Sequence, residues 1–211
     1  MKKLTIIAGT AFAIAILSAS VKAQSMAFRQ GSFEINVTEG NTYSNYTSNG
    51  LSTSVGEGHT IGCRDPFQIE YGLTNRWGIG ISSGADLYTF NGVSGGQVHT
   101  VTSEFTIDGS YHFFVTKKID VAAVASYGGS SIDFKGGTGD NSYSYATKGD
   151  IGRIGLHGRF FVLGHFGLVA MVTAFSETGV QQVASGYTGP RYSSSFWGIA
   201  KEFGICYRIK K

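Results

Sequence analysis

The clearest alternation of apolar and polar positions in the chain runs from Val101 to Val115. Successive side chains of a strand point to opposite faces, so the odd positions form an apolar face, and the even positions carry Glu104, Asp108 and His112. This run is much longer than a globular strand of about 5–6 residues, whereas a tilted strand crossing a bilayer needs about 9–11. The pattern predicts a membrane-spanning strand with one side toward lipid and the other toward a polar lumen.

Turn and loop residues divide the chain from residue 24 onward into eight strand-like runs, including the one just described. We expect strands at 28–42, 60–73, 78–91, 99–115, 119–134, 149–163, 166–180 and 191–209. Three connections are short, at 74–77, 116–118 and 164–165. Four are longer and rich in Gly, Ser, Thr and Tyr, at 43–59, 92–98, 135–148 and 181–190. Outer-membrane barrels have an even strand number, short periplasmic turns and longer outside loops. The predicted fold class is therefore all-β, an eight-stranded antiparallel up-and-down transmembrane β-barrel.

Two of these runs fit the alternation poorly. Lys201 falls on the otherwise apolar lipid face of the last run, where it either extends to the outer interface or marks a bulge that resets the register. The run 166–180 is apolar on both faces between Gly167 and Phe175, so its pattern does not predict which face is lipid-facing.

The N-terminus has the features of a secretory signal peptide. Lys2 and Lys3 precede an apolar run from Leu4 to Leu17, and Val21-Lys22-Ala23 is a small-x-Ala cleavage site. We expect a signal peptide at 1–23 and one barrel domain at 24–211, with an uncleaved anchor as the alternative. Cleavage would remove three of the 17 Lys and Arg residues and leave 14 against 14 Asp and Glu. A neutral mature chain argues against a nucleic-acid partner, which requires a basic surface.

Charged residues dominate the positions that alternate with the predicted lipid face. The predicted lumen holds Glu34, Arg64, Gln68, Glu70, Asp86, Glu104, Asp108, His112, Asp120, Arg153, His157, Arg159, Glu202 and Arg208. An eight-stranded barrel is just wide enough for side chains to fill it, and buried charges must be paired. We therefore expect an Arg–carboxylate network that fills the lumen and conducts little or nothing. A gated ion path or a proton-sensitive plug is the alternative.

Aromatic residues near the strand ends predict two belts at the membrane interfaces. The short-turn belt would contain Trp77, Tyr111, Phe113, Phe160, Phe166 and Tyr207, and the long-loop belt Tyr43, Tyr88, Phe90, Tyr127, Phe134, Phe175 and Trp197.

Patterns that would indicate catalysis or a cofactor are weak. Gly80-Ile-Ser-Ser-Gly84 matches the nucleophile motif G-x-S-x-G, but that motif needs a strand-to-helix turn, and here a strand is predicted to continue. The five histidines show no zinc-ligand spacing. Cys63 and Cys206 fall on predicted strands that are not neighbours, so we expect both to be free, with a disulfide between them in an exported chain as the alternative. We predict no enzyme activity, catalytic residue, metal or cofactor.

Two segments carry a family resemblance. Tyr71-Gly-Leu-Thr-Asn-Arg-Trp-Gly-Ile-Gly80 is similar to strand-turn-strand units of small outer-membrane barrels, including those of Bacteroidota, and Phe203-Gly-Ile-Cys-Tyr-Arg-Ile209 is similar to their aromatic-rich insertion signal. The chain departs from that signal by ending in Ile209-Lys210-Lys211 instead of a terminal Phe. With its strand pattern, the whole mature chain resembles OmpX-like and OmpA-barrel-like eight-stranded barrels. The resemblance implies the bacterial outer membrane, contact with its lipids and lipopolysaccharide, and insertion by the barrel assembly machinery.

The function we expect from these observations is a structural or surface-interaction role, with four extracellular loops that contact lipopolysaccharide, matrix or another cell. A narrow channel for small or hydrophobic solutes, of the OmpW kind, is one alternative. A soluble exported lipocalin-like ligand-binding barrel is another, and it requires the apolar faces to point inward.

Overall fold

The computed structural model describes residues 27–49, 57–91, 97–136, 143–181 and 192–209. The predicted signal peptide, 1–23, lies outside these residues, as do parts of the four predicted long connections. The strands are β1 (Phe33–Asn49), β2 (Glu57–Arg64), β3 (Phe67–Gly72), β4 (Trp77–Asn91), β5 (Gln97–Val115), β6 (Ile119–Gly136), β7 (Tyr143–Phe161), β8 (Phe166–Gln181) and β9 (Ser193–Ile209). Within the described ranges, no helix has the length and apolar character needed to span a membrane.

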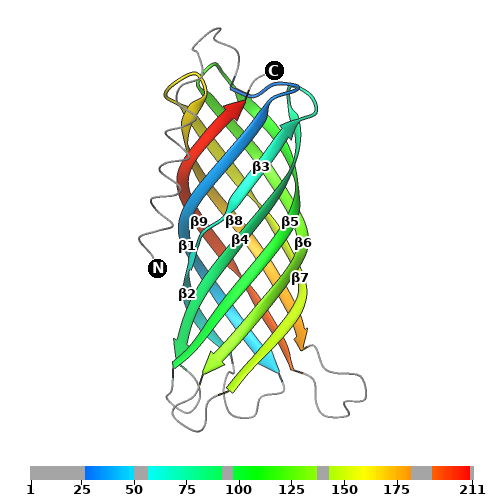
Figure 1. Cartoon of the computed structure of the whole chain (residues 1–211), viewed down its shortest axis with the longest axis vertical. Coiled ribbons are helices and arrows are strands. Elements are labelled where there is room, and N and C mark those ends of the chain that lie inside the picture. The colour runs from blue at the N-terminus through cyan, green and yellow to red at the C-terminus, as the bar shows by residue number, and fades with distance from the viewer. Residues whose placement is uncertain (1–26, 50–56, 92–96, 137–142, 182–191, 210–211) are drawn as a thin grey trace.

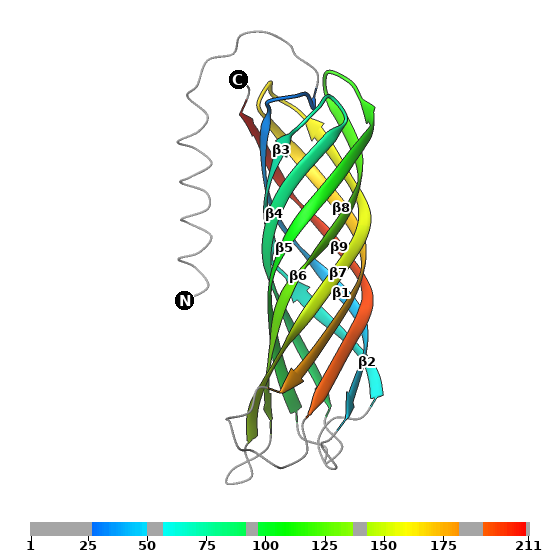
Figure 2. The same cartoon turned by 90° about the vertical axis from the view of Figure 1, so that its right-hand side faces the viewer.

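The strands form one closed antiparallel barrel (Figures 1 and 2). β2 and β3 both pair with β1 and with β4, and from β4 to β9 each strand pairs with the next. β9 pairs with β1 over 17 positions, from Phe33 opposite Ile209 to Asn49 opposite Ser193. Three short turns, β3–β4, β5–β6 and β7–β8, share one end of the barrel with the beginning of β1 and the end of β9. The predicted up-and-down fold class is confirmed.

The predicted strand 60–73 is divided into β2 and β3 by Asp65 and Pro66. Both segments pair with β1 in one unbroken register, since Gly40 faces Arg64 and Val37 faces Phe67. Proline has no N–H to donate to a sheet ladder, so the break is a local loss of hydrogen bonding within one barrel strand. The nine segments therefore make the eight strands of the barrel wall.

The pairing register defines the tilt of the strands. A path that steps from each residue to the residue facing it on the next strand goes once around the ring. The path starts at Phe33 of β1 and returns to β1 at Tyr43, ten residues farther along the strand. Its successive residues are Phe33, Tyr71, Ile79, Gly109, Ala125, Ile154, Ala174, Ile199 and Tyr43. In an eight-stranded barrel this stagger corresponds to a tilt of about 40°. The 19-residue strands β5 and β7 therefore stand about 45 Å tall at about 3.3 Å per residue.

Several strands are longer than predicted and continue into the segments predicted to be loops. Residues 43–49 form the end of β1 and pair with Ser193–Ile199 of β9. Their sequence, Tyr-Ser-Asn-Tyr-Thr-Ser-Asn, has no continuous apolar face, so alternation could not reveal a strand there. The apolar band of an outer-membrane barrel is about 25 Å tall, which leaves these polar strand ends beyond it.

Burial alternates along the strands, with apolar side chains outward and charged side chains inward. In β8, whose pattern predicted no phase, Val169, Met171 and Phe175 face inward, while Leu168 and Val172 face outward. This orientation contradicts the lipocalin-like alternative, which required the apolar faces to point inward.

A β-bulge changes the predicted phase of β5. His112 faces Ala122 and Phe114 faces Val121, so Phe113 is the extra residue. As a result, Phe113 and Phe114 are both exposed, at 48% and 49%, and Val115 turns partly inward. The predicted outward position of Val115 and inward position of Phe114 are therefore wrong.

The aromatic belts are only partly as predicted. Trp77 and Phe160 are exposed at the short-turn end, and Tyr43, Tyr127 and Trp197 are exposed farther along the wall. Three residues predicted for the long-loop belt, Tyr88, Phe134 and Phe175, are instead buried inside the barrel, because their positions share the inward phase of charged neighbours such as Asp86. The side chain of Phe90 lies outside the described residues.

Candidate functional site: a closed charged lumen

The structure places all thirteen charged residues of the predicted lumen, and Gln68 with them, at buried inward positions. The most exposed of them, Arg153, has only 8% of its surface accessible. Most of these residues form two groups of ion pairs, separated along the barrel axis by a zone of mainly neutral polar side chains.

The first group, the short-turn cluster, consists of Glu34, Glu70, His112, Asp120 and Arg159. The Nη1 atom of Arg159 lies 2.9 Å from Glu34 and 2.8 Å from Asp120, and its Nη2 atom lies 2.5 Å from Glu70. His112 contacts Asp120 through Nδ1 at 2.7 Å and Glu70 through Nε2 at 2.8 Å. One guanidinium thus joins carboxylates from β1, β3 and β6.

A glycine on β4 gives this cluster its space. Gly78 faces Gly72 on β3 and Ser110 on β5. A Cβ atom at Gly78 would collide with the carboxylate of Glu70 and the hydroxyl of Ser110. The residue without a side chain therefore lets Glu70 lie across the inner wall toward His112.

The second group, the loop-side cluster, consists of Arg64, Asp86, Glu104, Arg153 and Glu202. Arg64 bonds Asp86 at 2.7 Å, Glu202 at 2.8 Å, and also Glu104. Arg153 shares Glu104, with its Nη2 atom at 2.5 Å. Here Arg64 contacts all three carboxylates, and Arg153 is a second guanidinium that shares Glu104 with it.

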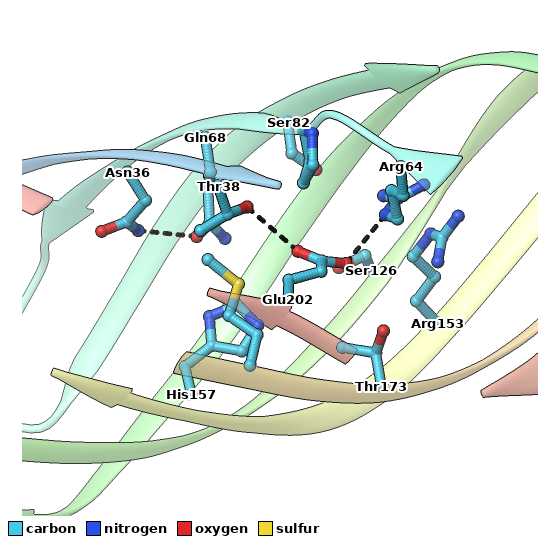
Figure 3. Close-up of a pocket in the computed structure, with 12 residues that line it drawn as sticks. Asn36, Thr38, Arg64, Gln68, Ser82, Ser126, Arg153, His157, Thr173 and Glu202 are labelled. Carbon is cyan, nitrogen blue, oxygen red and sulfur yellow. Dashed lines mark hydrogen bonds and ion pairs between the residues drawn. The ribbon is translucent and has the colours of Figure 1, made fainter. Parts of the chain in front are cut away.

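A small cavity of about 30 Å³ borders the loop-side cluster, with Arg64, Arg153 and Glu202 in its wall (Figure 3). Its wall includes Asn36, Gln68, His157 and Glu202. Asn36 donates to Gln68 at 2.8 Å, and Gln68 donates to Asp108 at 2.9 Å. A water needs about 10–15 Å³ of such volume, so the space fits about two waters.

Two of the predicted lumen residues occupy other surroundings. His157 lies in the wall of the cavity. The guanidinium of Arg208 lies 4.0 Å from the centre of the Phe161 ring, and its Nη2 atom donates to the carbonyl of Gly164 at 2.8 Å. Arg208 therefore closes the short-turn end of the barrel.

An aromatic layer crosses the lumen beyond the loop-side cluster. It consists of Tyr46, Tyr88, Val98, Ile132, Phe134, Phe175 and Phe196, contributed by six different strands. Phe196 lies at its centre, with its ring centroid 5.2 Å from that of Tyr88 and 6.3 Å from that of Phe134. This layer was not predicted, because three of its residues, Tyr88, Phe134 and Phe175, were assigned to the long-loop belt instead.

The N-terminal segment closes the opposite end. Ala27 and Phe28 are buried, and the Phe28 ring stacks on His112 at 3.4 Å with an interplanar angle of 9°. Gly31 has a φ of 78°, which favours glycine, and its N–H donates to Gly72 at 2.8 Å. Residues 28–32, predicted to begin the first strand, instead fold back into the barrel mouth.

One buried lumen carboxylate was not predicted. Glu177 of β8 is 1% exposed and lies two positions beyond Phe175 on the inward face. The mixed apolar pattern earlier in β8 hid this phase, which becomes evident only when β8 is paired with β7 and β9.

Ser110, His112 and Asp120 have the spacing of a catalytic triad. Ser110 Oγ is 3.1 Å from His112 Nε2, and Asp120 is 2.7 Å from Nδ1. A general base needs a free lone pair, but Glu70 also faces Nε2, so a protonated His112 would donate from both nitrogens. Phe28 covers the ring, and the arrangement is that of an ion pair.

The other candidate chemistry lies on continuous barrel wall. Ser82 of the G-x-S-x-G match lies within β4, with its hydroxyl 2.6 Å from that of Thr106, and a strand follows it instead of a helix. Cys63 and Cys206 are both free, as predicted. Within the described residues, no group of three His, Cys, Asp or Glu side chains could hold a metal ion.

The fold matches known barrels although the sequence has diverged. No protein-family model and no curated protein matches the chain. It is similar to the crystal structure of Ail, the attachment invasion locus protein of Yersinia pestis, with a TM-score of 0.52 and 14% identity over 85% of this chain and 99% of Ail.

Two other solved structures have lower TM-scores. OprG, an outer-membrane protein of Pseudomonas aeruginosa, gives 0.49 at 10% identity over 90% of this chain and 100% of OprG. The outer-membrane protein AlkL gives 0.48 at 14% identity over 92% of this chain and 97% of AlkL. The similarity to Ail confirms the predicted resemblance to small outer-membrane barrels at the level of the fold.

Proposed function

We propose that this chain is a non-conducting barrel of the bacterial outer membrane with a structural or surface-interaction role. Its outward wall supports the membrane placement, since exposed residues around the ring include Ile79, Ile107, Leu156, Val172 and Phe203. Leaving so many large apolar side chains in water would be costly, and lipid is the environment that suits them. Outer-membrane lipids and lipopolysaccharide are the expected neighbours, and the barrel assembly machinery the expected insertion partner.

One observation supports the non-conducting role: the lumen is closed at both ends, and most of the charged side chains between those ends form ion pairs. The aromatic layer covers the loop side, and Phe28 with Arg208 covers the short-turn side. An ion crossing the barrel would have to displace both covers and separate buried ion pairs, and breaking one such pair costs about 3–5 kcal/mol.

The remaining surface for a partner is the loop end of the barrel. The four longer connections follow β1, β4, β6 and β8, all at the end away from the short turns. We place an extracellular partner there, and we assign no enzyme activity, because Ser110 and His112 are enclosed by Phe28 and Glu70. The neutral charge of the mature chain does not favour nucleic acid.

Insertion and conductance should be measured on the same preparation. A band that shifts on boiling, from protein in detergent or outer-membrane fractions, is expected for the closed barrel. The folded protein should then give no steady single-channel current in planar bilayers. A large steady current would contradict the closed lumen, and a soluble protein without a heat shift would contradict the membrane placement.

The surface role needs a separate test. Each long connection can be shortened in turn while the heat shift is used to verify that the barrel still forms. Loss of cell attachment or lipopolysaccharide binding in at least one variant is expected. Unchanged surface behaviour in all four variants would argue against this role and leave a purely structural one.

A further inference from the structure

The outward wall carries one patch of charge at a height where lipid is expected. We consider the part of the wall that lies within nine residues of the short-turn end of each strand. Among the described residues there, three outward positions carry a charged side chain: Glu39, Asp65 and Lys201. All three are exposed. The other outward positions in this zone are apolar or small, apart from Asn41, Cys63 and a few hydroxyl residues. We call Glu39, Asn41, Asp65 and Lys201 the wall patch.

The wall patch lies on three neighbouring barrel strands. Lys201 of β9 faces Asn41 of β1, and Asn41 faces Cys63 of β2. Glu39 faces Asp65 across the interruption between β2 and β3, since Thr38 donates to the carbonyl of Pro66 at 3.2 Å. Like charges that face each other across a sheet are destabilising, so the isolated barrel offers no reason for this pair.

The charges of the patch are not neutralised within one barrel. Among the described residues, neither Glu39 nor Asp65 has an ion-pair partner. The Nζ atom of Lys201 lies 5.3 Å from the centre of the Tyr43 ring, and the long lysine side chain can extend toward the interface. The two carboxylates sit on shorter side chains, so in lipid they would need a cover.

The distribution of charge on the patch is self-complementary. Lysine lies on the β9 side, and the two carboxylates lie on the β1 and β2–β3 side. From the strand rise and tilt, the Cα atoms of the three charged residues lie within about 3 Å of one height along the barrel axis. A two-fold axis along the membrane normal reverses left and right, so β9 of one copy would face β1 of the other.

We propose that a second copy of this chain covers the wall patch and forms a symmetric dimer in the membrane. Lys201 of each copy meets Glu39 and Asp65 of the other, which gives two reciprocal groups of opposite charge. Val37, Ile199 and Phe203, exposed at 48%, 47% and 61%, form the apolar surround. This inference rests on the proposed membrane placement and adds a partner that the placement does not require.

The test uses charge-reversed pairs of the full mature chain. In Lys201→Glu all charges of the patch are negative, and in Glu39→Lys/Asp65→Lys all are positive. Each variant alone should repel itself, whereas a mixture of the two should form a complementary pair. Ala125→Glu is the matched control, because Ala125 is exposed on β6, four barrel strands away from β1.

Dimer formation can be measured by energy transfer between differently labelled copies in phosphatidylcholine–phosphatidylglycerol vesicles, over a range of protein-to-lipid ratios. Labels can be attached at Lys117→Cys in a Cys63→Ser background, since Lys117 is exposed in the turn between β5 and β6 and Cys206 is buried. We expect each reversed variant alone to need at least a tenfold higher protein-to-lipid ratio for half-maximal transfer. In the mixture, the protein-to-lipid ratio for half-maximal transfer should return close to that of the parent protein. Ala125→Glu should leave this ratio unchanged.

A gel heat shift on the same vesicles separates the two proposals. Folded, inserted parent protein that shows no energy transfer at any ratio would overturn the dimer and leave the membrane placement intact. So would unchanged transfer in Lys201→Glu alone. Failure of the parent to insert would overturn the membrane placement and the dimer together.

Discussion

The two ion-pair clusters of the lumen use the same residue types but are built differently. In the short-turn cluster, Arg159 alone contacts three carboxylates and has 0% side-chain exposure. In the loop-side cluster, Arg64 and Arg153 share Glu104, and the group borders the cavity. Arg64 also contacts all three carboxylates of its cluster. Removing Arg153 should therefore leave each of them a guanidinium partner, whereas removing Arg159 should leave Glu34 without one and Glu70 and Asp120 with His112 alone. Whether a second guanidinium remains after the substitution, more than the number of ion pairs, should decide how each cluster responds to mutation.

The largest effect is expected from Arg159→Met. It removes the guanidinium but preserves much of the side-chain volume, so Glu34, Glu70 and Asp120 lose their shared partner. Leaving a buried charge uncompensated costs about 3–5 kcal/mol. Urea unfolding in lipid vesicles, followed by the gel heat shift, measures the free energy of unfolding. A loss below about 1 kcal/mol would show that Arg159 is not central to the cluster.

Gly78→Ala tests the space that the same cluster requires. The added methyl group would press on Glu70 and Ser110, and overpacking of a filled interior costs about 1–3 kcal/mol. The same unfolding experiment measures it. Gly109→Ala is the control, because a Cβ atom at that outward position meets nothing within 4 Å; equal losses in both variants would point to backbone effects instead.

Arg153→Met makes the corresponding change in the loop-side cluster. Glu104 keeps its bond to Arg64, so the loss is one charged hydrogen-bonding partner, about 1.5–3 kcal/mol. We expect this value to be clearly smaller than that for Arg159→Met under identical conditions. Equal losses would mean that the two clusters do not differ in the way their contacts indicate.

Phe28→Ala should have a smaller effect on global stability. The variant removes the ring stacked on His112, and such an aromatic contact is worth about 0.5–1.5 kcal/mol beyond the area it buries. The N-terminal segment can detach without opening the wall, so the stronger signal should be faster hydrogen exchange around His112. Unchanged exchange would indicate that the segment does not cover the short-turn cluster in the membrane.

Salt should produce the smallest change. The pairs of both clusters lie inside the barrel, where screening is much weaker than between exposed charges. Raising NaCl from about 0.1 M to about 1 M should change the free energy of unfolding by less than about 0.5 kcal/mol. A large decrease would show that water and ions enter the lumen freely.

Part of the site could be predicted from local alternation. Glu104, Asp108 and His112 follow one another at intervals of four residues on one strand, so their common face follows from the pleat. Glu177, Tyr88 and Phe134 share the same kind of position but were not predicted to be inward. In β8 both faces are apolar over many residues, and an aromatic residue suits either a lipid interface or a closed lumen.

Which charges meet could not be read from the sequence. Arg159 and Glu70 are 89 residues apart, and their contact depends on the ring closing with a ten-residue stagger. The fold-back of Phe28 onto His112 likewise depends on an open barrel mouth beside β1. The facing of Glu39 and Asp65 depends on the pairing of β1 with β2 and β3.

Side-chain alternation and turn chemistry are local properties, so the order of amino acids is enough to predict tilted strands with an apolar and a charged face and short turns at one end. The partners of each charge, the two covers of the lumen and the place of the wall patch are seen only in the folded barrel. These features depend on the pairing register, on the bulge at Phe113 and on the break at Pro66, which together determine which residues face each other across the barrel.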